Sequence, residues 1–285
     1  MENILEVYNL NKTYTDFSLS NISFALPEDC ITGFIGVNGA GKTTTIRSIL
    51  DVVKRDSGKI KIFGKDFDGN EKELKNRIGV VFDDSYFYEE LSMAEMKSII
   101  APSYDNWCEE DYQQNMKRFN LNPKQKIDTL SKGMKMKLSI AAAFAHHPQL
   151  LILDEATSGL DPIVRDDILD MFLEFVQDEE HSILVSSHIT SDLEKVADYI
   201  VFIHEGKMIF CEPKDELLEC YGIIKCGAAQ FEAIDKKDIV TYRKQAYEWQ
   251  ILVTNRKKMA KKYPKAMVIP ATIDEIMLLY VKGEN

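Results

Sequence analysis

The sequence predicts an α/β protein with a parallel β-sheet covered by helices. Short apolar runs of the kind that form strands buried on both faces alternate with stretches of helical periodicity. Alternation of strands and helices indicates a parallel sheet with helices packed on it. At 285 residues the chain is long enough for one large domain and a second, small one.

In the first third of the chain the pattern is mainly that of strands. Residues 4–35 predict strands and turns, and the last of these strands is the apolar run ITGFIG. A glycine-rich turn follows, and then a helix over 42–53. Further strands are predicted at 58–64, where apolar and polar residues alternate, and at 77–83, which is short and apolar.

The middle of the chain alternates helices with apolar strands. Helical periodicity runs over 92–119 and is interrupted by Pro102, and a second helix over 133–146 is stopped by Pro148. The run 149–155 (QLLILDE) predicts a buried strand, 163–177 an amphipathic helix, and 182–188 (SILVSSH) another buried strand.

The last 65 residues differ in charge from the rest of the chain. Residues 221–285 contain 12 Lys and Arg against 7 Asp and Glu, whereas the whole chain has a net charge of −11. This change of sign predicts a boundary near residue 221. The tail has its own strands at 246–253 and 266–270, and a helix at 272–281 with Thr272 as N-cap and Glu275 completing a capping box. Its basic helix at 256–263 either faces anionic lipid or, as we favour, is a solvated surface.

A glycine-rich motif between a predicted strand and a predicted helix carries the strongest functional signal. The segment GVNGAGKT fits the pattern GxxxxGK[ST], in which backbone N–H groups surround phosphates at a helix N-terminus. The lysine places a charge at the β- and γ-phosphates, and the threonine hydroxyl ligates Mg²⁺. The predicted nucleotide-binding residues are Gly36, Asn38, Gly39, Ala40, Gly41, Lys42, Thr43 and Thr44.

Two carboxylates end the apolar strand at 149–155. Asp154 lies at the C-terminal end of that strand, where α/β sheets bind ligands, and can hold Mg²⁺ directly or through water. Glu155 is suited to act as general base for an attacking water. His188 follows another apolar strand and either contacts the γ-phosphate or is a structural residue. Ser131 and Gly133 begin a helix, where Ser131 is the expected N-cap.

The order and spacing of GVNGAGKTT, LSKGM, LLILDE, SGLD and SSH resemble those of ATP-binding cassette (ABC) ATPases over residues 4 to about 215. The resemblance implies a P-loop NTPase core with an N-terminal antiparallel β subdomain, a helical subdomain at about 86–140, and a nucleotide-binding domain spanning 1–220. Residues 221–285 then form a small accessory α+β appendage. The resemblance also implies that the chain binds and hydrolyses ATP with Mg²⁺.

The resemblance assigns further roles residue by residue. LSKGM stands where the family has its LSGGQ signature, so Ser131 and Gly133 are expected to face ATP bound to another cassette, and Asp161 of SGLD to reach across the same dimer. Glu155 and His188 match the catalytic glutamate and the switch histidine. Tyr14 matches the aromatic residue that stacks on adenine, unless it fills the core.

The segment at 77–91 departs from the family pattern. Asp83 stands where the family usually places a glutamine that contacts Mg²⁺ and its attacking water. A carboxylate can still reach the metal but adds negative charge beside the triphosphate. The aromatic residues Tyr86, Phe87 and Tyr88 suit either a protein–protein contact or buried packing.

Composition limits the cellular setting. The longest apolar stretches are far shorter than the about 20 residues needed to span a bilayer, and the N-terminus lacks a signal-peptide pattern. The five cysteines are scattered and predict reduced thiols. The negative charge argues against a nucleic-acid partner. We therefore expect a cytoplasmic protein, and the resemblance to ABC ATPases implies that an integral-membrane permease holds it at the inner face of the cell membrane.

Three classes of function remain open from the sequence. The leading one is the motor subunit of an ABC transporter, in which two cassettes enclose two ATP molecules and drive a separate permease. The second is a soluble ABC-type ATPase of a non-transport process, and the third is an ATP-dependent interaction module with little turnover, which the Asp83 departure keeps open.

Overall fold

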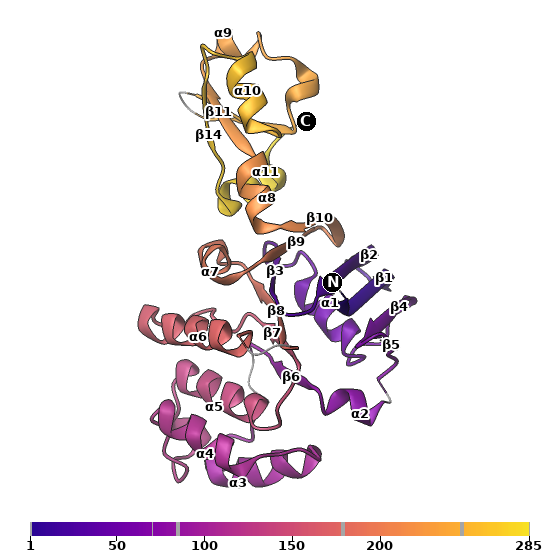
Figure 1. Ribbon diagram of the computed structural model, residues 1–285, viewed down its shortest axis with the longest axis vertical. Coiled ribbons are helices and arrows are strands. Elements are labelled where there is room, and N and C mark those ends of the chain that lie inside the picture. Colours follow the sequence, from indigo (N-terminus) through magenta and orange to yellow (C-terminus); the bar gives the residue numbers. More distant parts are fainter. Residues whose placement is uncertain (1, 70, 84–85, 178–179, 246–247, 285) are drawn as a thin grey trace.

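The computed structural model describes residues 2–69, 71–83, 86–177, 180–245 and 248–284, and these form three β-sheets with helices packed around them (Figure 1). Two sheets belong to the first 213 residues and one to the C-terminal part. The α/β class predicted from the alternation of strands and helices is confirmed.

The central sheet has the strand order β10-β9-β3-β8-β7-β6. Its strands are β3 (Ile31–Ile35), β6 (Ile78–Val81), β7 (Leu150–Asp154), β8 (Ser182–Ser187), β9 (Tyr199–His204) and β10 (Lys207–Pro213). Neighbouring strands are parallel except for β9 and β10, which are antiparallel. Every residue of β3, β7 and β8 is buried, which explains their continuous apolar runs.

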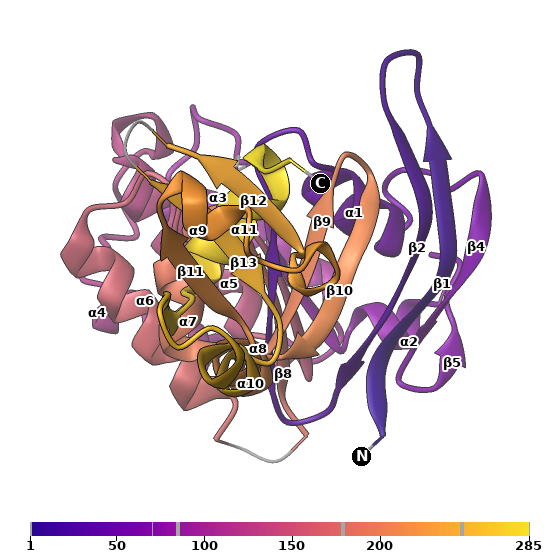
Figure 2. The same cartoon turned by 90° about the horizontal axis from the view of Figure 1, so that it is seen from above.

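A second, antiparallel sheet is formed near the N-terminus by β1 (Asn3–Thr13), β2 (Ser18–Pro27), β4 (Ser57–Ile62) and β5 (Lys65–Asp66). It lies beside α1 (Lys42–Ile49), as Figure 2 shows, and apolar residues of both elements share one core. The predicted helix over 42–53 ends four residues early, because Asp51 adopts a left-handed backbone with φ of 54°. The short helix α2 (Lys72–Lys75) also contributes to this core through Leu74.

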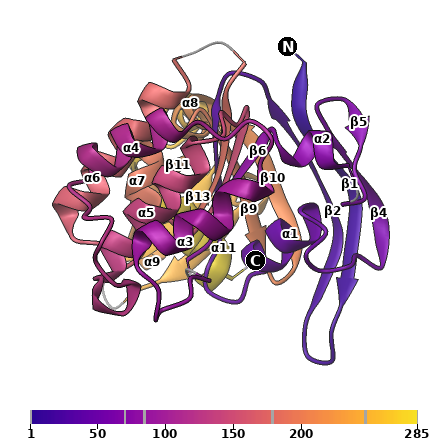
Figure 3. The same ribbon diagram turned by 90° about the horizontal axis from the view of Figure 1, so that it is seen from below.

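Five helices cover the opposite face of the central sheet (Figure 3). They are α3 (Met93–Ile100), α4 (Glu109–Arg118), α5 (Lys132–Phe144), α6 (Pro162–Phe175) and α7 (Thr190–Val196). The break expected at Pro102 is a 3₁₀ turn at Ala101–Ser103. Side chains of β7 alternate between the two cores, since Leu151 and Leu153 face these helices while Leu150 and Ile152 face α1. Among the described residues no helix is both long and apolar enough to cross a membrane.

The C-terminal part forms a four-stranded sheet, in the order β12-β13-β11-β14. Its elements are α8 (Lys214–Cys220), β11 (Gly222–Cys226), α9 (Ala228–Phe231), β12 (Thr241–Lys244), β13 (Trp249–Val253), α10 (Arg256–Lys262), β14 (Met267–Pro270) and α11 (Ile273–Lys282). The sequence patterns did not predict β11 and β12. Part of the strand predicted over 246–253 lies outside the described residues, because only its segment from 248 onward is described.

The last helix joins this small unit to the large one. The capping box of Thr272 and Glu275 at the start of α11 is confirmed. Just after it, the Ile273 backbone N–H donates to Glu194 Oε1 at 2.6 Å, and Thr190 Oγ1 donates to Asp274 Oδ1 at 3.3 Å. Ile273 also belongs to the main core of the large unit. Residues 221–285 therefore fold onto the large unit through α11.

The basic helix α10 is largely paired within the chain. Lys262 Nζ lies 2.5 Å from Asp238 Oδ2, and Lys257 forms an ion pair with Glu219. Met259, a residue of the same helix, is buried. These contacts favour the solvated-surface interpretation of the basic run over the lipid-facing one.

Candidate functional site

The glycine-rich loop between β3 and α1 depends on glycine at two positions. A Cβ on Gly36 would lie 2.6 Å from the Ile203 carbonyl oxygen, and one on Gly41 would lie 2.6 Å from Leu19 Cδ2. Gly41 also has a φ of 114°, which side-chain-bearing residues rarely adopt. Gly41 is the N-cap of α1, and because it has no side chain it cannot cap the first N–H groups of the helix. These N–H groups therefore remain available at the loop.

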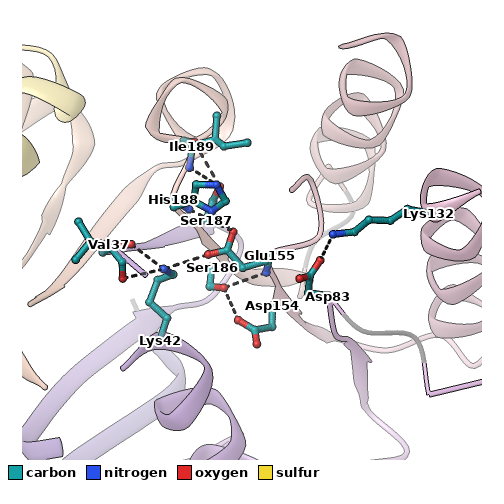
Figure 4. Close-up of polar contacts among 11 residues, drawn as sticks. Val37, Lys42, Asp83, Lys132, Asp154, Glu155, Ser186, Ser187, His188 and Ile189 are labelled. Carbon is teal, nitrogen blue, oxygen red and sulfur yellow. Dashed lines mark hydrogen bonds and ion pairs between the residues drawn. The ribbon is translucent and has the colours of Figure 1, made fainter. Parts of the chain in front are cut away.

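Lys42, the first residue of α1, has its charge at the centre of the site. Its side chain is only 5% exposed, and Nζ donates to the Gly36 carbonyl oxygen at 2.7 Å. The same nitrogen lies 3.1 Å from Glu155 Oε1 (Figure 4). The loop thus holds a nearly buried ammonium group against the carboxylate that follows β7.

Glu155 lies between Lys42 and His188. Its backbone is left-handed, with φ of 54°, which is uncommon outside glycine. Such a conformation persists where the surrounding contacts hold the residue in place, often at functional sites. His188 Nδ1 donates to Glu155 Oε2 at 2.6 Å, since a carboxylate can only accept. Lys42, Glu155 and His188 therefore form one continuous polar chain at the C-terminal ends of β3, β7 and β8 (Figure 4).

Ser186 orients both carboxylate residues, although the sequence did not single it out. Its side-chain hydroxyl on β8 donates to Asp154 Oδ1 at 2.6 Å and accepts from the Glu155 backbone N–H at 3.1 Å. Ser186 is fully buried, and Asp154 is 3% exposed. The signal that could have indicated it is a pair of serines at the C-terminal end of a strand with an apolar centre, directly before His188.

The predicted loop residues surround one pocket of about 590 Å³. Asp83 and Glu155 line it together with residues on and around the loop, which are Asp16, Phe17, Val37, Asn38, Gly39, Gly41, Lys42, Thr43 and Thr44. Gly36 and Ala40 contribute to the loop behind this lining, and Ala40 is buried.

Tyr14 is not among the residues that line this pocket. It is 45% exposed, with Lys12 Nζ 5.5 Å from its ring centroid, so the interpretation that it fills the core is wrong. Phe17, directly before β2, lines the pocket instead, and its ring lies 2.8 Å from where a Cβ on Gly41 would be. The sequence signal for Phe17 is an aromatic residue within the polar turn YTDF. Stacking of Tyr14 on adenine remains a prediction.

Ser131, Gly133 and Asp161 lie apart from this pocket. Ser131 is the N-cap of α5, as predicted, and accepts from the Met134 N–H at 3.2 Å. A Cβ on Gly133 would meet Val164 at an ordinary 3.7 Å, so no contact within the chain requires glycine there. Asp161 caps α6 by accepting from the Ile163 and Val164 N–H groups. These exposed helix starts are available to a second molecule.

Asp83 lies at the edge of the pocket, and it has an ion-pair partner that the sequence did not predict. Lys132 Nζ approaches Asp83 Oδ1 to 2.5 Å (Figure 4). Of the three neighbouring aromatic residues, Tyr86 and Tyr88 are 67% and 61% exposed, while Phe87 packs against the core.

This arrangement combines an anion-binding loop with a carboxylate in the pocket wall and an imidazole bonded to that carboxylate. A buried lysine and free helix N–H groups bind phosphates, and a carboxylate next to them can take a proton from water. The fold and site therefore define the class of nucleotide-hydrolysing P-loop proteins.

Comparison with known proteins identifies the family within that class. A family model described as ABC transporter matches residues 19–158. The chain is 37% identical over 220 residues to the bacitracin transport ATP-binding protein BcrA of Bacillus licheniformis, covering 76% of this chain and 72% of the relative. The chain therefore belongs to the ABC transporter family, as an ATP-binding and ATP-hydrolysing subunit.

Solved structures agree with this assignment. The ATP-binding subunit of an ABC transporter aligns with a TM-score of 0.68 at 29% identity, over 75% of this chain and 91% of that one. A dimeric ATP-binding cassette in a post-hydrolysis state with ADP and Pi aligns with a TM-score of 0.66 over 73% of this chain and 98% of that one. At 20% identity the second likeness shows a shared fold.

Proposed function

We propose that the chain hydrolyses Mg-ATP in the loop pocket with Glu155 as general base and His188 as its positioning partner. The observation that carries this is the polar chain from Lys42 through Glu155 to His188. Phosphate oxygens compete with Glu155 for the Lys42 ammonium, so triphosphate binding frees the carboxylate to accept a proton from water. The His188 bond then keeps Glu155 oriented at the γ-phosphate.

The residues around the pocket fit a magnesium ion. Mg²⁺ prefers oxygen ligands, and Thr43 in the pocket lining and Asp154 at the end of β7 supply a hydroxyl and a carboxylate. The carboxylate of Asp83, the third ligand that the sequence predicts, is instead paired with Lys132. Asp154 is nearly buried and fixed by Ser186, as metal-ligating carboxylates usually are. When bound, the ion neutralises charge on the phosphates.

We further propose that ATP lies between two copies of the cassette, or between this chain and a related one. Ser131, Gly133 and Asp161 lie outside the pocket of their own chain, and no contact within the chain requires glycine at position 133. Ile163, at the start of α6 beside Asp161, is 75% exposed and suits the same interface.

The permease is proposed to dock on the helical subdomain. An apolar pocket of about 230 Å³ opens there between β6, α3 and α5, lined by residues that include Phe82, Phe87 and Met96. The exposed residue Tyr86 also lines this pocket, and the exposed Tyr88 follows Phe87 in the chain. Aromatic residues around a shallow apolar pocket are typical of protein anchors, and this docking would hold the protein at the cytoplasmic face of the membrane.

The catalytic assignment is tested with Glu155→Gln. The variant keeps the size of the side chain but cannot take a proton, so hydrolysis should fall by about 10²–10⁴-fold while ATP still binds. Light scattering should detect a dimer with ATP and a monomer with ADP. Glu180→Gln is a matched control, because Glu180 also has a positive φ, of 76°, but precedes β8 at the opposite end of the sheet. Wild-type turnover by Glu155→Gln would show that Glu155 is not the general base.

The partner and cargo are tested in the cell. Copurification of the chain with a polytopic membrane protein supports the transport role, and its absence favours a soluble ATPase. The relative named for bacitracin transport makes bacitracin the first cargo to test, by comparing the susceptibility of cells that express the wild-type chain or Glu155→Gln.

A further inference from the structure

Two of the residues at which the site departs from the family pattern are in contact with each other. Asp83 replaces a neutral glutamine, and Lys132 replaces a glycine of the signature motif. We propose that Lys132 neutralises Asp83 so that a carboxylate can stand in the ATP pocket. The proposal rests on the proposed function, since it assumes that ATP occupies this pocket.

The position of Asp83 makes an unpaired charge there unfavourable for ATP. Asp83 lines the same pocket as Lys42 and Thr43, so its carboxylate faces the space assigned to the phosphates. Like charges brought together weaken binding, and the triphosphate is strongly negative. Lys132 Nζ, at 2.5 Å from Asp83 Oδ1, supplies the compensating charge.

Lys132 is held in this orientation by a second segment. A Cβ placed on Gly159 would lie 3.4 Å from Lys132 Nζ and 3.6 Å from its Cδ, so the lysine stem passes directly over this glycine. Gly159 belongs to the SGLD segment that follows Glu155. The side chain thus starts on α5, crosses the loop after β7 and ends at the residue that follows β6 and Phe82.

Fold stability does not explain this pair. The side chains of Lys132 and Asp83 are 45% and 40% exposed, and exposed ion pairs contribute little to stability. A neighbouring pair from the same helix provides a comparison. Lys135 Nζ lies 2.7 Å from Glu89 Oε1, but Glu89 is not among the residues lining the ATP pocket. Only the first pair places a charge where the nucleotide binds.

A double-mutant cycle on Mg-ATP affinity tests the proposal. Lys132→Met removes the charge and keeps the stem, which leaves Asp83 unpaired, so affinity should fall by about 3- to 10-fold. The double variant Lys132→Met with Asp83→Asn should recover most of this loss because no unpaired carboxylate remains. The loss should shrink at high ionic strength, since both groups are partly exposed.

Control variants distinguish a failure of the proposed Asp83–Lys132 pairing from a failure of the proposed ATP site. Lys135→Met, in the matched pair, should leave affinity unchanged, and thermal melting should show that all variants are folded. Additive effects of Lys132→Met and Asp83→Asn, or an equal loss from Lys135→Met, would overturn the proposed pairing while leaving the ATP site intact. If Lys42→Ala bound Mg-ATP with wild-type affinity in the same calorimetric titrations, the assignment of this pocket to ATP, on which the pairing depends, would be wrong.

Discussion

Ser186→Ala removes one hydroxyl group that serves both carboxylates of the site. In the wild-type chain this hydroxyl donates to Asp154 Oδ1 at 2.6 Å and accepts from the Glu155 N–H at 3.1 Å. The Glu155 N–H also donates to the Ser186 carbonyl oxygen at 3.1 Å, and that bond survives the substitution. The main loss therefore falls on Asp154, which we assign to Mg²⁺.

The size of the effect follows from the burial and charge of Asp154. The carboxylate is 3% exposed, so water cannot fully replace the lost donor. A hydrogen bond to a charged group contributes about 1.5–3 kcal/mol, and loss of an outer partner of a metal ligand typically costs about 10–100-fold. We expect a 10- to 100-fold lower kcat/KM by these rules, together with a higher Mg²⁺ requirement.

The assay is phosphate release by the purified chain at fixed ATP and varied Mg²⁺. Ser182→Ala is a matched control, because Ser182 is an equally buried serine at the other end of β8. Its hydroxyl has no hydrogen-bond partner among the described residues, so its removal should leave the kinetics unchanged. Wild-type kcat/KM and Mg²⁺ dependence in a folded Ser186→Ala would refute the view that Ser186 positions Asp154.

Four further outcomes can be checked on the purified chain. Lys42→Ala should weaken Mg-ATP binding by at least about 10-fold in calorimetry, because the loop loses its charged donor. A chain lacking residues 221–285 should still bind ATP but melt at a lower temperature, because removal of α11 exposes core that it covers; failure of a folded truncation to bind would contradict the domain boundary. Burial lowers the pKa of His146 below its usual 6.5, so the unfolded chain takes up the proton first and stability should fall from pH 7.5 to 5.5; a melting series should show a flatter dependence for His146→Gln. Burial raises the pKa of the Cys30 thiol to about 12, so a thiol reagent should modify exposed Cys220 well before Cys30.

The local elements of the site were predictable because their signals lie within short stretches of sequence. In GVNGAGKT, Gly36 and Gly41 lie too close to other parts of the chain for a side chain, and Gly41 also has a positive φ. The glycines of the motif therefore indicate the backbone conformation of the loop. The apolar runs before Asp154 and His188 predict buried strands whose ends meet at one edge of a parallel sheet. The Ser131 N-cap and the Thr272 capping box are likewise local.

Contacts between distant segments could not be predicted in this way. Phe17 enters the ATP pocket, and Tyr14 stays outside its lining, because of the path taken by the turn between β1 and β2. Strands β11 and β12 are stabilised mainly by pairing with β13 and β14 rather than by a strong pattern of their own.

The sequence by itself determined the α/β class, the phosphate-binding loop, the carboxylates after β7 and the resemblance to ABC ATPases, because each depends on residues close together in the chain. Only the tertiary structure decided that Ser186 holds Asp154, that Lys132 crosses Gly159 to reach Asp83, and that α11 packs against α7. The physical reason is that a hydrogen bond or an ion pair depends on a few ångströms between two atoms. Residues as far apart as Asp83 and Lys132 reach that distance only after β6, α5 and the loop after β7 have packed together.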